Sequence, residues 1–119
     1  MYSQQLLDYF EHPRNAGDVS NPHADVQLEN PACGDILRLS FRVENGVIAA
    51  VGFRAKGCVP AMGCASALTE LIKGRTLDEA RKTKREDVIH AVGGLPEAST
   101  HAGHLAIDAL QLALKNLKL

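Results

Sequence analysis

Two runs of alternating apolar and polar residues, joined by a short polar link, constrain the fold of this chain more than any other feature. Apolar side chains recur at every second position, as Leu37, Leu39, Phe41 and Val43 and then as Val47, Ala49, Val51 and Phe53. A period of two places such residues on one face of a strand. The link Glu44-Asn45-Gly46 contains a glycine that can take the positive φ of a short hairpin loop. The sequence therefore predicts a β-hairpin.

The register of this hairpin is set by matching apolar residues across it. The match pairs Val43 with Val47, Phe41 with Ala49 and Leu37 with Phe53. Extended by four residues, the ladder brings Cys33 opposite Gly57, beside Cys58, and a one-residue slip brings Cys33 opposite Cys58. In either register two thiols and the Asp35 carboxylate converge at one end of the sheet, with about 5 Å between facing residues. That geometry suits a shared metal ion.

Helices are predicted on both sides of the hairpin. Apolar stripes at helical spacing indicate helices over residues 3–11, from Pro60 to a stop at Gly74, and over roughly residues 99–117 with Ser99 as the cap. Capping-box patterns at Thr76 and Thr83 each predict the start of a further short helix.

A third strand is expected before the hairpin, because Ala24, Val26 and Leu28 also alternate and would shield one hairpin edge. The expected fold class is α+β, a small three-stranded antiparallel sheet with helices packed on one face. One domain over residues 1–119 is expected for a chain of 119 residues.

The converging residues suit a zinc or iron centre. Cys33 and Cys58 offer two soft sulfur ligands and Asp35 one hard oxygen ligand. Cys58 lies just ahead of a predicted helix, and a helix N-terminus lowers a thiol pKa by stabilising the thiolate. A nucleophilic thiol at Cys33 or Cys58 is therefore an alternative to a metal centre.

A fourth ligand is required for a tetrahedral site, and three residues are candidates. His101 and His104 are three residues apart at the start of the last helix and so share a face. Cys64 lies about one turn into its own helix. Each also has a structural explanation: Cys64 as a small core residue, His104 as a surface histidine and His101 as a residue of the helix cap.

Composition excludes several function classes. The net charge is −1, so there is no electrostatic argument for binding nucleic acid or an anionic membrane. No run of 18 apolar residues and no signal peptide is visible. Three cysteines are an odd number without a disulfide framework, which favours a cytoplasmic protein with free or metal-bound thiols.

A series of short motifs resembles the IscU/NifU-type iron–sulfur cluster scaffold in the same order along nearly the whole chain. The motifs are His12-Pro13-Arg14-Asn15, Pro31-Ala32-Cys33-Gly34-Asp35, Gly57-Cys58, Leu68-Thr69-Glu70, Lys73-Gly74, Leu77-Asp78-Glu79-Ala80, Leu95-Pro96 and His101. The Cys-Gly-Asp and Gly-Cys elements are the specific ones. The lack of an insertion after Cys58 makes the chain more similar to the IscU form than to the SufU form.

The resemblance implies an assembly platform rather than a turnover enzyme. In such a protein a cysteine desulfurase delivers sulfur, iron is bound, and a [2Fe–2S] cluster forms and passes to a recipient apoprotein. The ligands implied are Cys33, Asp35 and Cys58, with His101 beside them and zinc as an alternative occupant. A frataxin-like protein is a further implied partner.

Two departures from the family pattern leave other functions open. The family has a third cysteine directly after the histidine of the last helix, and this chain has Ala102 there. The stretch Leu95-Pro96-Glu97-Ala98-Ser99 replaces the family's chaperone-binding Leu-Pro-Pro-Val-Lys, which argues against recognition by a dedicated chaperone. The alternatives are a zinc- or iron-binding homologue that regulates a desulfurase, a thiol enzyme, and a plain interaction domain.

Overall fold

Three strands form one antiparallel sheet, in the order β1-β2-β3, in the part of the chain that the structure describes. The structure is a computed structural model that describes residues 2–31 and 34–119, so the predicted ligand Cys33 lies outside the described residues. The elements are α1 (Gln4–Glu11), β1 (Ala24–Asn30), β2 (Asp35–Glu44), β3 (Val47–Lys56), α2 (Val59–Ile72), α3 (Leu77–Arg81), α4 (Arg85–Ala91), the 3₁₀ turn η1 (Glu97–Ser99) and α5 (His101–Lys115).

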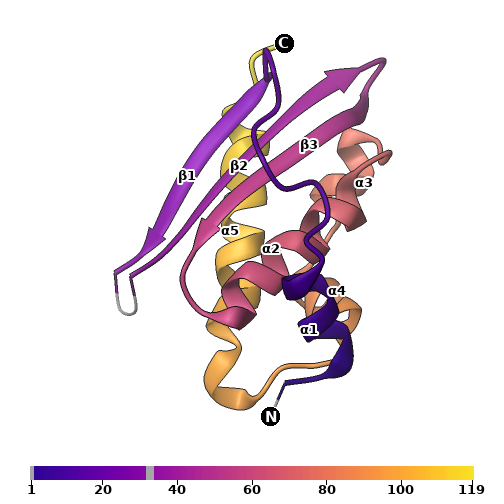
Figure 1. Cartoon of the computed structure of the whole chain (residues 1–119). Coiled ribbons are helices and arrows are strands. Elements are labelled where there is room, and N and C mark those ends of the chain that lie inside the picture. Colours follow the sequence, from indigo (N-terminus) through magenta and orange to yellow (C-terminus); the bar gives the residue numbers. More distant parts are fainter. Residues whose placement is uncertain (1, 32–33) are drawn as a thin grey trace.

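Helices α2 and α5 cover one face of the sheet (Figure 1). The predicted α+β class, the hairpin and the third strand are confirmed, and β1 does pair with one edge of β2. Phe41, Leu39 and Leu37 of β2 are at most 2% exposed, so the apolar face of the hairpin forms part of the core. No helix among the described residues is long and apolar enough to cross a membrane.

The predicted hairpin register is wrong by two residues. Phe41 lies opposite Val51 rather than Ala49, and Leu37 lies opposite Ala55 rather than Phe53. The loop is shorter than the sequence suggested, since only Asn45 and Gly46 lie between the strands. Both have positive φ, 54° and 76°, as a two-residue type I′ turn requires.

A β-bulge accounts for the rest of the difference. Between Arg42 and Val43 the partner on β3 changes from Ala50 to Ile48, which leaves Ala49 without a partner in the ladder. Ile48 is fully buried and Ala49 is exposed, so the bulge reverses which residues of β3 face the core near the turn. A strictly alternating pattern cannot anticipate this extra residue.

The segment between α1 and β1 crosses the face of the sheet opposite α2 and α5 (Figure 1). Val19 N–H donates to Ser40 Oγ at 3.2 Å, and Gly17 N–H donates to the Phe53 carbonyl at 2.8 Å. The chain approaches so closely that a Cβ on Gly52 would lie 2.4 Å from the Gly17 carbonyl oxygen. Both faces of the sheet are therefore covered at this point.

The predicted helix starts are confirmed in part. Ser3 Oγ accepts the Leu6 N–H at the start of α1, and Thr76 forms the expected capping box with Glu79. The next helix begins one residue later than predicted, since the Lys84 N–H rather than the Thr83 N–H donates to a carboxylate, that of Asp87.

The last helix also begins later than expected. Ser99 does not cap it but ends the 3₁₀ turn Glu97–Ser99, and Thr100 precedes the first helical residue, His101. The 3₁₀ turn replaces the cap because Ser99 N–H and Thr100 N–H donate to the carbonyls of Pro96 and Glu97. His101 is thereby placed at the very start of α5 rather than one residue into it.

Arg14 fixes helix α1 against α2. Its guanidinium donates to Asp8 Oδ2 at 2.6 Å, lies 3.4 Å from Glu70 Oε2 and stacks over the Tyr9 ring at 4.4 Å from the centroid. The hydrogen bond from Arg14 lowers the pKa of the Asp8 carboxyl below its usual value. A lowered carboxyl pKa stabilises the folded state at pH values above the unfolded-state pKa.

We therefore expect Asp8→Asn to lower the melting temperature at pH 7. The gap to the wild type should close as the pH falls through the lowered pKa of Asp8, because the wild-type carboxylate is then protonated too. Thermal melts between pH 7 and pH 3 check this, with Glu44→Gln as a control at an exposed carboxylate of the hairpin. A gap that stays constant over this range would contradict the role of the Asp8 charge.

Candidate metal centre

The starts of three elements meet at one end of the sheet. Asp35 is the first residue of β2, Cys58 is the N-cap of α2, and His101 is the first residue of α5. One ligand atom from each of the three lies within 4.8 Å of the other two. Cys58 is 23 positions from Asp35 and 43 positions from His101 in the sequence, yet the fold brings the three donor atoms together.

The three donor atoms are close enough to share one ion. Asp35 Oδ2 lies 3.5 Å from Cys58 Sγ and 3.5 Å from His101 Nε2, and Cys58 Sγ lies 3.9 Å from His101 Nε2. The Asp35 side chain is 3% exposed and the His101 side chain 36% exposed. The Asp35 carboxylate is thus the buried member of the group of donors, and the His101 imidazole is the member that contacts solvent. One sulfur, one oxygen and one nitrogen donor form a set that zinc and iron both accept.

The turn before β2 and the helix after β3 hold the carboxylate and the thiol in place. Gly34 takes a φ of +72°, and its N–H donates to the Asn30 carbonyl at 2.7 Å just before Asp35 begins the strand. Cys58 N–H donates to Asp35 Oδ1 at 3.1 Å. The side chain of one predicted ligand is therefore bonded to the backbone of another.

The expected lowering of the Cys58 thiol pKa is wrong. Burial raises the pKa of this thiol, and the Asp35 carboxylate beside it raises it further, while hydrogen bonds from backbone N–H groups, chiefly that of Ala61, oppose the rise without outweighing it. The sequence predicted the helix that begins after Cys58, but not that the Asp35 carboxylate would be buried beside the Cys58 sulfur. A metal ion at this point would replace the proton that the thiol otherwise keeps.

The other candidate ligands lie outside this group. Cys64 is fully buried in α2, and burial raises the pKa of its thiol to about 12. His104 is exposed and contacts Arg85 of α4, whose Nη1 lies 3.0 Å from His104 Nε2. Ala102, which follows His101 and offers no donor atom, is 1% exposed.

A groove of about 350 Å³ gives access to the histidine side of the group. It runs from the end of β1 to the first turns of α5, and its walls include Pro31, His101, His104 and Asp108. Sequence reasoning missed this groove, because it arises from the packing of α5 beside β1 and no local pattern reports that.

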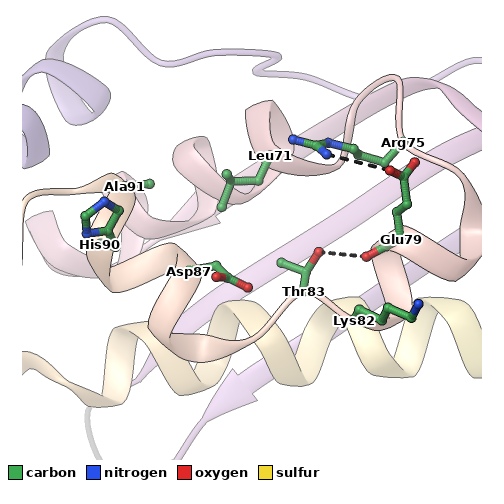
Figure 2. Close-up of a pocket in the computed structure, with 8 residues that line it drawn as sticks. All are labelled: Leu71, Arg75, Glu79, Lys82, Thr83, Asp87, His90 and Ala91. Atoms are coloured by element: carbon green, nitrogen blue, oxygen red, sulfur yellow. Dashed lines mark hydrogen bonds and ion pairs between the residues drawn. The ribbon is translucent and has the colours of Figure 1, made fainter.

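A separate hollow of about 470 Å³ lies between α2, α3 and α4 (Figure 2). On one side of it, Arg75 Nη1 lies 3.8 Å from Glu79 Oε2, and Thr83 Oγ donates to the Glu79 carbonyl at 3.3 Å (Figure 2). Its lining contains neither a thiol nor any member of the Asp35, Cys58 and His101 group. It is therefore not part of the candidate metal centre.

The two described thiols should differ sharply in reactivity. We expect an alkylating reagent at pH 8 to modify Cys58 more slowly than a free cysteine, and to leave Cys64 unmodified while the protein is folded. Peptide mapping by mass spectrometry after timed quenching checks this, and the same reaction in denaturant is the control. Modification of Cys64 in the folded protein at the rate of Cys58 would contradict the burial of its thiol.

Comparisons with known proteins find NifU-like and IscU proteins as relatives of this chain. The profile of the family described as "NifU-like N terminal domain" matches residues 1–119. The chain is similar to the iron–sulfur cluster assembly scaffold protein IscU 1 of Archaeoglobus fulgidus, at 38% identity over 114 residues that cover 96% of this chain and 74% of that protein. It is also similar to the scaffold protein IscU of Escherichia coli K12, at 36% identity over 121 residues, 98% of this chain and 94% of that protein.

Solved structures show the same fold at low sequence identity. The crystal structure of the N-terminal part of a NifU-like protein from Brucella abortus superposes with a TM-score of 0.80 at 14% identity, covering 96% of this chain and 92% of that one. The resemblance drawn from the sequence motifs is confirmed by the family profile and the relatives. The chain belongs to the NifU-like N-terminal domain family.

Proposed function

We propose that this protein is an iron–sulfur cluster assembly scaffold, which holds iron and a nascent cluster and passes the cluster to apoproteins. The observation that carries the proposal is the meeting of Asp35, Cys58 and His101, whose donor atoms lie within 4.8 Å of one another. The relatives that match nearly the whole chain are named as scaffold proteins of this kind, which supports the same role here. Such a protein carries its cargo and does not turn over a substrate.

Each donor has a distinct part in this proposal. Cys58 supplies a thiolate, the ligand that cluster iron prefers, and Cys33, two residues before Asp35 in the sequence, would supply a second. Asp35 and His101 supply oxygen and nitrogen, which hold cluster iron less firmly than sulfur does. A mixed donor set of this kind favours release of the cluster over permanent retention.

Partners follow from the chemistry of the cargo. Sulfide in a cluster has to come from a sulfur donor, and a cysteine desulfurase is the class of enzyme that we propose for this step. A frataxin-like protein is a further proposed partner, and recipient apoproteins take the finished cluster. The exposed side of His101 and the adjoining groove leave the centre open to such partners.

A zinc-binding homologue that regulates a desulfurase is the second candidate function. Ala102 favours it, because alanine offers no donor atom at the position where the family has a third cysteine. A centre completed by nitrogen and oxygen rather than a third thiolate suits zinc or a single iron ion. The thiol-enzyme alternative is less well supported, since the raised pKa of Cys58 leaves less of the nucleophilic thiolate.

The proposed ligands are tested by anaerobic reconstitution with iron, sulfide and a reductant. We expect Cys58→Ser and Cys33→Ser each to reduce bound iron and visible absorption to near zero, because each removes one thiolate. Cys64→Ala is the matched control, since it removes a thiol outside the group and should keep iron content at the wild-type level. If both serine variants kept full metal content, the centre would lie elsewhere.

The place of Ala102 is tested by restoring the missing sulfur. Ala102 follows His101 in the first turn of α5, so a cysteine at this position would place a thiol next to the proposed ligand His101 in the sequence, close to the helix N-terminus. We expect the wild type to reconstitute a cluster poorly, and Ala102→Cys to raise both the yield and the lifetime of the cluster severalfold. A robust wild-type cluster that survives Cys64→Ala and gains nothing from Ala102→Cys would show that His101 already completes the centre.

A further inference from the structure

Gly57 occupies a position where a side chain would collide with a proposed ligand. It follows β3 and directly precedes Cys58, and its φ of +150° is one that L side chains rarely adopt. A Cβ built on Gly57 would lie 2.0 Å from Asp35 Oδ1 and 2.7 Å from Asp35 Cγ. By contrast, Gly34 and Gly74 also have positive φ, but a Cβ on either would meet nothing within 4 Å.

The carboxylate that fills this space divides its two oxygens between two tasks. Oδ1 accepts the Cys58 N–H at 3.1 Å. Oδ2 faces the donor cluster, 3.5 Å from Cys58 Sγ and 3.5 Å from His101 Nε2. With Oδ1 bonded to the backbone, Oδ2 is the oxygen presented to an ion, which corresponds to binding through one oxygen rather than two.

We infer that Gly57 is a positioning residue of the metal centre: its missing side chain leaves the space in which the Asp35 carboxylate turns a single oxygen toward a Zn²⁺ or Fe²⁺ ion. This inference rests on the proposed role of Asp35, Cys58 and His101 as ligands. It adds a residue that carries no donor atom and that acts only through the orientation of Asp35.

The consequence of filling this space is specific. The atoms that a methyl group at position 57 would meet first belong to the end of the Asp35 side chain and not to the backbone. The carboxylate can therefore rotate away while the chain still folds. It then loses the hydrogen bond from the Cys58 N–H, and Oδ2 no longer points toward Cys58 Sγ and His101 Nε2. Metal affinity should fall more than the backbone strain at this φ alone would cause.

The test is a double-mutant cycle of Gly57→Ala and Asp35→Ala, read by Co²⁺ binding in competition with a chelator. Co²⁺ stands in for Zn²⁺ or Fe²⁺, and its thiolate charge-transfer band reports ligation by sulfur. We expect Gly57→Ala to weaken Co²⁺ binding at least about tenfold in the wild-type background, the size of effect usual for residues that orient metal ligands. In the Asp35→Ala background the same change should cost less than about twofold, because the carboxylate through which Gly57 acts is gone.

Gly74→Ala is the matched control for backbone strain. Gly74 has a φ of +83°, lies at the end of α2 away from the centre, and has open space around the added methyl group. This variant should bind Co²⁺ as tightly as the wild type. An equal loss of affinity from Gly57→Ala in both backgrounds, or no loss in the wild-type background, would overturn the inference.

Two further outcomes remain decisive. If Gly57→Ala fails to fold, the double variant decides: removal of the carboxylate removes the collision, so a folded double variant supports the inference and an unfolded one overturns it. If the wild type shows no thiolate band, or keeps it undiminished in both Cys58→Ser and Cys33→Ser, the proposed centre itself fails and this inference fails with it. A wild-type band that is lost in Cys58→Ser, without coupling in the cycle, overturns only the role of Gly57.

Discussion

The hydrogen bond from Cys58 N–H to the buried Asp35 carboxylate is the interaction on which the candidate centre depends. It joins the first residue of β2 to the N-cap of α2. A buried carboxylate is costly unless its charge is compensated, and the start of a helix supplies both N–H groups and a favourable dipole. His101 Nε2 lies 3.5 Å from Oδ2 of the same carboxylate, so the Asp35 side chain contacts residues at the starts of both α2 and α5.

The approach of Asp35 to Cys58 was predictable from the sequence, although the register used to argue for it was wrong. Alternation gives the strands and the loop gives the reversal, so residues just outside the two strands have to meet at the open end of the hairpin. The real ladder differs by a bulge that leaves Ala49 unpaired, and it ends with Ile36 opposite Lys56. Beyond this last pair, Asp35 is the first residue of β2 and Gly57 directly follows the end of β3. Cys58, the next residue, therefore still lies beside the Asp35 carboxylate.

The details that the sequence could not provide are those that depend on distant contacts. Ser99 has the composition of a cap, yet a 3₁₀ turn precedes α5 and places His101 at its first residue. The thiol pKa of Cys58 was predicted from its helix alone, whereas burial and a carboxylate 23 residues earlier decide its direction. A local sequence pattern predicts the helix or strand that contains a residue. The pKa of that residue also depends on the groups that the fold packs against it, which can be distant in the sequence.

A scaffold that gives its cargo away has to remain folded without it, and the distribution of buried residues meets this requirement. Most of the largest fully buried side chains among the described residues are apolar, such as Phe41 and Leu39 of the sheet, Leu68 of α2 and Leu110 of α5, and Asp35 is the one proposed ligand in this set. Burial of such apolar side chains stabilises the fold by about 1.5–3 kcal/mol each, before conformational entropy is counted. In a zinc finger, by contrast, the ion supplies most of the folding free energy and its loss unfolds the chain. Here the donors lie at the starts of β2, α2 and α5, so release of an ion should loosen these ends while the apolar core keeps the sheet and its helices together.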